Sequence, residues 1–282
     1  MTAIHPEEYV DAIRAAAEAC GGHIDADTIL STGSYRAALH AAGGACAMVE
    51  ELLAGRAPFG FCGMRPPGHH AERATAMGFC LFNNVAIAAQ HALEHGAQRV
   101  LVLDWDVHHG NGTNDIFHGR GDVLFASIHQ SPLYPGTGRL DDVGSGRGEG
   151  FSLNLPVPPG SGERAFLSLV QHVVAPAARE FRPQILLVSA GYDAHREDPL
   201  AQCELEDGSY AALAACVREL GAELAAPVGV VLEGGYALGA LARSVAATVE
   251  ALGGDAAAPD VEPDATTARA VEHLGRWWPL AA

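Results

Sequence analysis

Short apolar runs rich in β-branched residues alternate along the chain with longer, alanine-rich stretches. Runs such as VLVL and ILLV are apolar at every position, which is typical of central strands in a parallel sheet that helices cover on both faces. The pattern predicts strands over 58–62, 99–106, 122–129, 151–156, 184–190 and 228–233. It predicts helices over 6–20, 33–54, 82–95, 162–181, 207–225 and 238–252. We therefore expect an α/β fold with three layers (αβα), a central, mostly parallel β-sheet and right-handed crossovers.

The pattern contains no linker and no internal repeat, so residues 1–282 are expected to form a single domain. The tail over 253–282 is rich in alanine, proline and aspartate and is expected to be loosely packed. It contains the segment HLGRWWPL, whose two tryptophans either dock this end of the chain or remain exposed.

Composition excludes several classes of protein. Hydrophobic residues make up 49% of 282 residues, which rules out intrinsic disorder and a small disulfide-stapled scaffold. Acidic residues outnumber basic ones by 34 to 17, and the basic residues do not cluster, so no nucleic-acid partner is expected. Six cysteines without C-x-x-C spacing, no signal-peptide pattern and no membrane-spanning apolar run predict a cytoplasmic protein without a membrane partner.

Reactive side chains follow four of the predicted strands. Strand 58–62 leads to two adjacent histidines, strand 99–106 to DWDVHHGNG, strand 184–190 to SAGYDAH, and strand 228–233 to a tyrosine. In an open parallel sheet, ligands bind beyond the carboxyl ends of the strands. The four segments therefore predict one functional site at that edge.

Asp106, His108 and Asp193 are candidate metal ligands. Alternate residues of an extended segment point the same way, so Asp106 and His108 can aim at one point. With Asp193 they form the three-ligand set of a catalytic metal site that keeps a position open. Zn²⁺ fits this set, and Fe²⁺ or Co²⁺ would also bind it. The plainer alternative is that Asp104 and Asp106 cap the next helix, which is common for a lone aspartate after a strand but not for this combination.

His69 and His70 follow a rigid Pro-Pro-Gly turn. Adjacent histidines also arise by chance in a chain that has 14 of them. Because imidazole titrates near neutral pH, we interpret the pair as acid–base machinery, with Asp104 and Asn111 available to orient the rings. Tyr236 is either packed or donates its hydroxyl to an oxyanion.

Six segments together closely resemble the zinc-dependent histone deacetylase family, which has the arginase/deacetylase fold. In family order they are RPPGHHAE (65–72), MGFCLFNN (77–84), DWDVHHGNGT (104–113), SIHQSPLYPGTG (127–138), SAGYDAHREDPL (189–200) and LEGGY (232–236). The residues of the fourth segment, together with Asn111 in place of an aspartate, resemble those of the bacterial relatives of the class II enzymes. The resemblance implies an amidohydrolase that cleaves N-acetyl- or N-acyl-lysine in proteins or peptides to the free amine and acetate.

The resemblance also implies roles for individual residues. One Zn²⁺ per chain would be bound by Asp106, His108 and Asp193, and Tyr236 would polarise the acetyl carbonyl together with the metal. Water would attack that carbonyl, and a tetrahedral oxyanion would form between the metal and the tyrosine hydroxyl.

In the same resemblance, His70 is the general base and then the general acid, and Asn111 orients it. His69, paired with Asp104, is its electrostatic partner. A structural K⁺ would use Asp104 and Ser127, with the main-chain carbonyls of Asp106, His108 and Ile128.

The family's substrate tunnel is implied here by Phe79 and Tyr134, with Gly78 beside them. For Phe79, ordinary core packing is the alternative. Acetylpolyamine-selective relatives often carry glutamate where this chain has Leu200, so the position favours acyl-lysine, with an acetylpolyamine amidohydrolase as the alternative. Acidic residues at 197 and 198 weaken this electrostatic argument.

Several departures and rival interpretations bear on this assignment. Family members usually carry a further N-terminal strand and loop before the segment that resembles IHPEEYVDAI, so we expect a catalytic domain that is N-terminally short.

A ureohydrolase shares the D-A-H pattern at 193–195 but has aspartate where this chain has Glu197. A non-catalytic acyl-group binder conflicts with the intact tyrosine and histidine pair, and a nucleotide-binding protein would need a glycine-rich fingerprint. The assembly state is left open, a homo-oligomer included.

Overall fold

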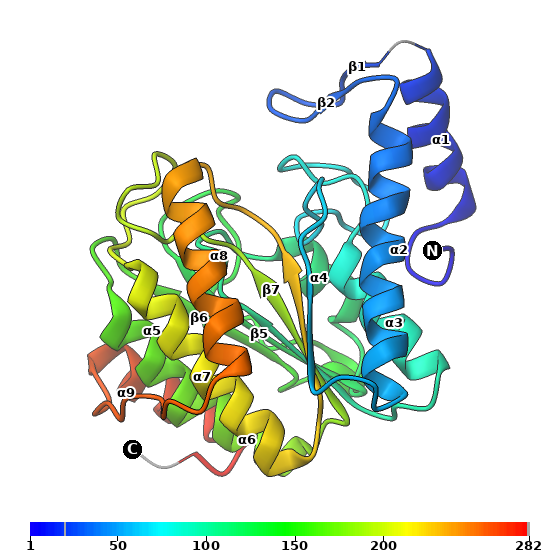
Figure 1. Cartoon of the computed structure of the whole chain (residues 1–282). Coiled ribbons are helices and arrows are strands. Elements are labelled where there is room, and N and C mark those ends of the chain that lie inside the picture. The colour runs from blue at the N-terminus through cyan, green and yellow to red at the C-terminus, as the bar shows by residue number, and fades with distance from the viewer. Residues whose placement is uncertain (20, 281–282) are drawn as a thin grey trace.

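The computed structural model describes residues 1–19 and 21–280. At its centre is a six-stranded sheet in the order β3-β8-β7-β4-β5-β6, in which every neighbouring pair is parallel. The strands are β3 (Phe59–Cys62), β4 (Val100–Asp104), β5 (Val123–Gln130), β6 (Ser152–Val157), β7 (Ile185–Ala190) and β8 (Val228–Leu232). Helices cover both faces of the sheet (Figure 1). The predicted three-layer α/β fold is confirmed, and each of the six predicted strands is present.

Of the nine α-helices in the described chain, two were not predicted and seven account for the six predicted helices. They are α1 (Glu7–Glu18), α2 (Ser34–Leu53), α3 (Asn84–Glu94), α5 (Glu163–Leu169), α6 (Ala175–Phe181), α7 (Asp207–Leu224) and α8 (Leu238–Gly253), with α5 and α6 joined by a π-helical turn over Val170–Val174. Cys20, where the first predicted helix ends, lies outside the described residues. The sequence did not predict α4 (Asn111–Phe117), α9 (Ala265–Leu274) or the antiparallel ribbon of β1 (Gly22–His23) and β2 (Ile29–Leu30).

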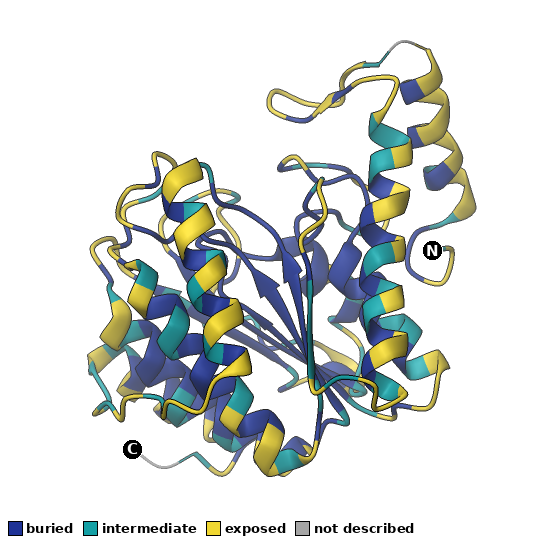
Figure 2. Cartoon of the chain, viewed as in Figure 1, coloured by how far each residue is buried: buried dark blue, intermediate teal, exposed yellow. Residues whose placement is uncertain are grey.

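The two faces of the sheet carry separate hydrophobic cores. Leu101 and Leu103 of β4 pack against the helices α5 to α9, whereas Val100 and Val102 of the same strand pack on the side of α1 to α4. Successive side chains of a strand point to opposite faces, so a strand between two helical layers must be apolar throughout. Figure 2 shows this burial: the central strands are dark blue, that is buried, along their length.

The parallel arrangement brings the carboxyl ends of the strands to a single edge. Asp104, the last residue of β4, is in register with Ser189 of β7 on one side and with Ser127 of β5 on the other. The loops that follow β3, β4, β7 and β8 therefore begin beside one another. These are the loops that carry the candidate reactive residues.

The C-terminal region packs through α9 and both tryptophans, with Trp277 partly buried and Trp278 buried in the core. Asp264 accepts a hydrogen bond from the Thr267 backbone N–H (2.8 Å) and so caps α9. The Thr267 hydroxyl lies 2.7 Å from that of Ser168 on α5. Trp278 is buried and donates from Nε1 to the Gly150 carbonyl (2.7 Å).

The five cysteines within the described residues are free. Of the helices in residues 1–19 and 21–280, none combines the length and the hydrophobicity that a membrane span requires.

Replacing Trp278 tests whether the C-terminal region is part of the folded core. Trp278→Ala removes a buried aromatic side chain and its hydrogen bond, so it should lower the free energy of unfolding by roughly 3 kcal/mol. Leu238→Ala, at a side chain that is 77% exposed, should change it by less than about 0.5 kcal/mol. Urea unfolding followed by circular dichroism measures both, and equal stability of the two variants would contradict the packing described.

Candidate active site

Asp106, His108 and Asp193 meet at the carboxyl edge of the sheet. Each offers one ligand atom, and these atoms lie within 4.8 Å of one another. His108 Nδ1 lies 3.1 Å from Asp106 Oδ1 and 3.1 Å from Asp193 Oδ2. All three side chains are buried, and they come from the loops after β4 and β7. The structure thus brings together the residues predicted as metal ligands.

The chemistry of this group fits a divalent metal ion. Two carboxylates buried so close together repel each other, and a cation between them removes that repulsion. Carboxylate oxygen and imidazole nitrogen are also the ligands that zinc accepts at catalytic sites. Gly191 and Gly234 line the carboxylates so closely that a side chain at either position would collide with Asp106. The backbone therefore leaves room only for the carboxylates and what they bind.

The protonation of His108 reflects the two carboxylates beside it. Burial alone would lower its pKa, but the hydrogen bonds to Asp106 and Asp193 raise the pKa of His108 to about 10. Burial and the charge of Asp106 raise the pKa of Asp193 to about 6. At neutral pH the imidazole nitrogen between the carboxylates therefore holds a proton, which a metal ion must displace.

His69 and His70 are adjacent in the chain, but their outward nitrogens have different partners. His69 Nδ1 lies 2.8 Å from Asp104 Oδ2, whereas His70 Nδ1 lies 2.7 Å from Asn111 Oδ1. The Asn111 amide nitrogen donates to Glu72 Oε1 (3.0 Å), which turns the amide oxygen toward His70. An amide oxygen only accepts, so Nδ1 of His70 carries the proton and Nε2 keeps its lone pair.

The two imidazoles also titrate in opposite directions. Burial and the neighbouring charge of His69 hold the pKa of His70 well below its ordinary value. For His69, burial works against the charged form, but Asp104 and Asp106 prevail and raise its pKa well above that value. The result is a neutral imidazole beside a charged one, with ring centroids 4.1 Å apart.

Tyr236 reaches the same site from the loop after β8. Burial and the charges of Asp193 and Asp106 raise its pKa above the ordinary value, so the phenol keeps its proton and can donate a hydrogen bond. Its ring lies 5.7 Å from that of Phe79 between centroids.

A cavity of about 230 Å³ connects these groups to the surface. Phe79, Tyr134 and Leu200 are 37%, 38% and 42% exposed, as expected of residues at a mouth. Gly78 lies so close to the His70 ring that any side chain there would displace the imidazole. The residues that line the cavity are Asp27, Pro67, His69, His70, Gly78, Phe79, His108, Leu133, Tyr134, Leu200, Gly234 and Tyr236.

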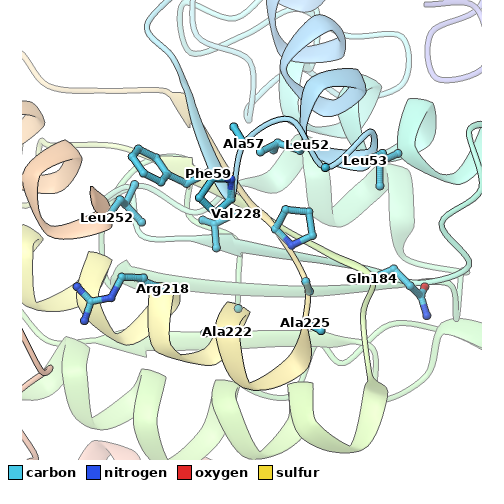
Figure 3. A pocket seen from close by; sticks show the side chains of 15 residues that line it. Leu52, Leu53, Ala57, Phe59, Gln184, Arg218, Ala222, Ala225, Val228 and Leu252 are labelled. Carbon is cyan, nitrogen blue, oxygen red and sulfur yellow. The ribbon is translucent and has the colours of Figure 1, made fainter. Parts of the chain in front are cut away.

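A larger cavity, of about 650 Å³, lies among the amino ends of β3 and β8 and the carboxyl ends of α2, α7 and α8 (Figure 3). Its lining is largely apolar, with Leu52, Phe59, Val228 and Leu252 among the residues drawn. Arg218 borders it, but its guanidinium donates to the carbonyl of Ala251 in the last turn of α8 and to those of Gly254 and Ala256 just after it. Size alone therefore does not identify the functional site, because the reactive groups surround the smaller cavity.

Several residues near the site were missed or misjudged by reasoning from the sequence. The Glu233 carboxylate is buried, with Oε2 accepting from the backbone N–H groups of Gly68 (2.6 Å) and His69 (3.1 Å). Its signal was a glutamate ending an apolar strand. Asp27, in the turn between β1 and β2, lines the cavity, and no motif marked it.

The two acidic residues before Leu200 were expected to add negative charge near it. Glu197 is instead paired with Arg243 (2.8 Å), and the Asp198 carboxylate is buried against backbone N–H groups. Both carboxylates are engaged within the protein.

A model of the histone deacetylase domain matches residues 1–252, and the chain therefore belongs to the histone deacetylase family. It is 46% identical to histone deacetylase 14, chloroplastic, of Arabidopsis thaliana over 81% of this chain and 56% of that protein. It is 42% identical to a histone deacetylase-like amidohydrolase of Pseudomonas aeruginosa over 89% of this chain and 67% of that protein.

Among solved structures, a crystal structure of the HDA15 HD domain superposes with a TM-score of 0.92 at 38% identity, covering 99% of this chain and 78% of that chain. The chain spans about half the length of the chloroplastic plant relatives that it matches. The fold and the family are thus shared with deacetylases.

Metal binding should be coupled to proton release at His108. Because the pKa of His108 is about 10 in the metal-free site, binding of Zn²⁺ at pH 7 should release about one proton. Below pH 6, Asp193 is protonated as well, so more protons are released and the affinity falls. Calorimetric titrations in buffers of different ionisation enthalpy measure the proton count.

The matched control for this experiment is His91→Gln, at a histidine on α3, which should leave the proton count unchanged. His108→Gln should remove the released proton and weaken binding. A proton count of zero for the unaltered protein at pH 7 would contradict the protonated state described for His108.

Proposed function

We propose that this chain is a zinc-dependent deacetylase that hydrolyses the amide of N-acetyl- or N-acyl-lysine in peptides or proteins to the free amine and acetate. The observation that supports this most strongly is the convergence on one narrow cavity of three kinds of group. These are the Asp106–His108–Asp193 cluster, which reaches the cavity through His108, a neutral imidazole at His70 and a protonated phenol at Tyr236. Amide hydrolysis needs an electrophilic aid, a base and an oxyanion donor, and the three groups match these needs.

Zinc held by Asp106, His108 and Asp193 would act as a Lewis acid toward the amide carbonyl and the attacking water. His70 accepts a proton from that water at Nε2 as the water oxygen bonds to the carbonyl carbon. The Tyr236 hydroxyl donates to the carbonyl oxygen as negative charge develops on it. When the C–N bond breaks, His70 returns its proton to the leaving amine, and acetate is the other product.

Two neighbouring contacts keep His70 ready for both steps. The Asn111 oxygen holds the Nδ1 proton and so keeps the lone pair on Nε2. The positive charge of His69, balanced by Asp104, lowers the basicity of His70, so that a proton accepted from water is readily given up to the amine.

The shape of the cavity mouth favours acyl-lysine. Phe79 and Tyr134 offer aromatic walls to the methylene groups of a lysine side chain, and Gly78 leaves space beside them. Leu200 adds an apolar rim rather than a charge. An acetylpolyamine is the second candidate, because the Asp27 carboxylate lines the cavity and can pair with a second ammonium group.

A K⁺ ion at Asp104 and Ser127, which are in register on neighbouring strands, is a further part of the proposal. The carbonyls of Asp106, His108 and Ile128 would complete its ligands. The cytoplasmic location and a homo-oligomeric assembly stay predictions.

Removing the Tyr236 hydroxyl tests the proposed reaction. In Tyr236→Phe, turnover of an acetyl-lysine peptide should fall roughly 100- to 1000-fold, because the developing oxyanion loses a donor. Bound zinc, counted by atomic absorption, should not change. Tyr35→Phe, which removes a hydroxyl outside the cavity, is the control, and undiminished turnover by Tyr236→Phe would contradict the assigned role.

A side-by-side assay distinguishes the two substrate classes. Acetyl-lysine peptide, longer acyl-lysine peptides and acetylspermidine are compared at equal enzyme and zinc. Higher kcat/KM for the peptides supports the first candidate. Higher kcat/KM for acetylspermidine, lost in Asp27→Asn, supports the second.

Replacing Asn111 by aspartate should shift the pH profile. A carboxylate at Nδ1 raises the pKa of His70, by about one unit or more. The reaction starts with neutral His70, so on acidification activity should be lost already at a higher pH than in the unaltered protein. The acidic limb of the kcat/KM profile should therefore move to higher pH. Combining Asn111→Asp with Glu72→Gln removes the new repulsion between carboxylates, and an unmoved acidic limb in both variants would refute the assignment of His70.

A further inference from the structure

Asp198 joins two loops of the site through one buried carboxylate. It lies in the loop after β7 and is 6% exposed. Its Oδ2 accepts from the backbone N–H groups of Tyr236 (2.6 Å) and Ala237 (3.1 Å), and its Oδ1 accepts from the backbone N–H of Leu200 (3.0 Å). One side chain thus serves three backbone donors in two segments.

The segment that carries Tyr236 has little rigidity of its own. Gly234 and Gly235 precede it, and Gly235 has a positive φ of 130°, a conformation that other residues rarely adopt. Ala237 stands at the N-cap of α8 and has no side-chain acceptor for the first N–H groups of the helix. The Asp198 carboxylate, from a different loop, accepts instead from the two backbone N–H groups just before the helix, those of Tyr236 and Ala237. Its negative charge suits the positive end of this 16-residue helix.

The second oxygen of Asp198 reaches the rim of the cavity. Leu200, whose N–H it accepts, is 42% exposed and lines the mouth. The depth of the cavity, where the Tyr236 hydroxyl acts, and its rim are therefore tied to the same carboxylate. A displacement of either loop breaks a hydrogen bond to a buried anion, which is costly.

We propose that Asp198 is a positioning residue of the deacetylase proposed above, on which this inference rests. It fixes the backbone of Tyr236 so that the hydroxyl meets the substrate carbonyl, and it couples that position to the rim at Leu200. Asp198 acts through Tyr236 and takes no part in proton transfer.

The test is a double-mutant cycle with Tyr236. In Asp198→Asn, an NH2 group, which only donates, replaces one of the two carboxylate oxygens. The side chain can then accept from the Leu200 loop or from the Tyr236 loop, but not from both, and one loop is released. The kcat for an acetyl-lysine peptide should fall roughly 10- to 100-fold, with KM changed less. In the Tyr236→Phe background the same substitution should cause no further loss, because the group that Asp198 positions is already absent.

A purely structural role predicts the opposite result for the cycle. If Asp198→Asn lowers kcat by the same factor in both backgrounds, Asp198 does not act through Tyr236 and the inference is overturned. Asp264→Asn is the matched control, since Asp264 also accepts a backbone N–H at a helix start, on α9. It should leave kcat unchanged.

A second measurement does not depend on activity. Amide hydrogen exchange, followed by NMR on the metal-free protein, should show protection at residues 200, 236 and 237. Exchange at these amides should be faster in Asp198→Asn but not in the control Asp264→Asn. Rapid exchange at these amides in the unaltered protein overturns the inference, whatever the enzyme does. Protected amides in a protein that hydrolyses none of the acyl amides would instead refute the proposed function, while the anchoring by Asp198 stands.

Discussion

The burial of several carboxylates at one edge of the sheet is the constraint on which the site depends. Asp104, Asp106, Asp193 and Glu233 are each at most 1% exposed. A buried carboxylate is stable only when hydrogen-bond donors or a cation replace the water it has lost. The loops after the strands must therefore turn their backbone N–H groups inward, and this requirement shapes them.

The donors to these carboxylates are mainly backbone groups. Asp106 accepts from the N–H groups of His108 (2.9 Å) and Gly234 (2.9 Å), and Asp193 accepts from that of Val107 (3.0 Å). The last two of these bonds each join a candidate ligand to a different loop of the site. The geometry of the candidate metal cluster is thus set together with that of the tyrosine loop, rather than independently of it.

The same principle explains why two adjacent histidines behave differently. His69 meets the carboxylate of Asp104, whereas His70 meets the amide of Asn111, and only the carboxylate supports a positive charge. The charged ring then depresses the basicity of its neighbour. The choice of acceptor, carboxylate or amide, therefore separates a charged imidazole at His69 from a neutral one at His70.

The sequence by itself determined the strands, most of the helices and the residues that gather at the edge of the sheet. Strands buried on both faces are continuous apolar runs, and the ligands follow them directly, so both signals are local. Helix α9 was missed because it lies in a tail rich in alanine, proline and aspartate, and it is held by the Asp264 cap and by packing against α5. The acceptor of each histidine was implied by the family resemblance and by no local pattern, and only the tertiary structure decided where the carboxylates of Asp198 and Glu233 bind, because those partners lie in other loops. Side-chain partners that are distant in the chain leave no periodic or local pattern, so they are fixed only when the strands bring the loops together.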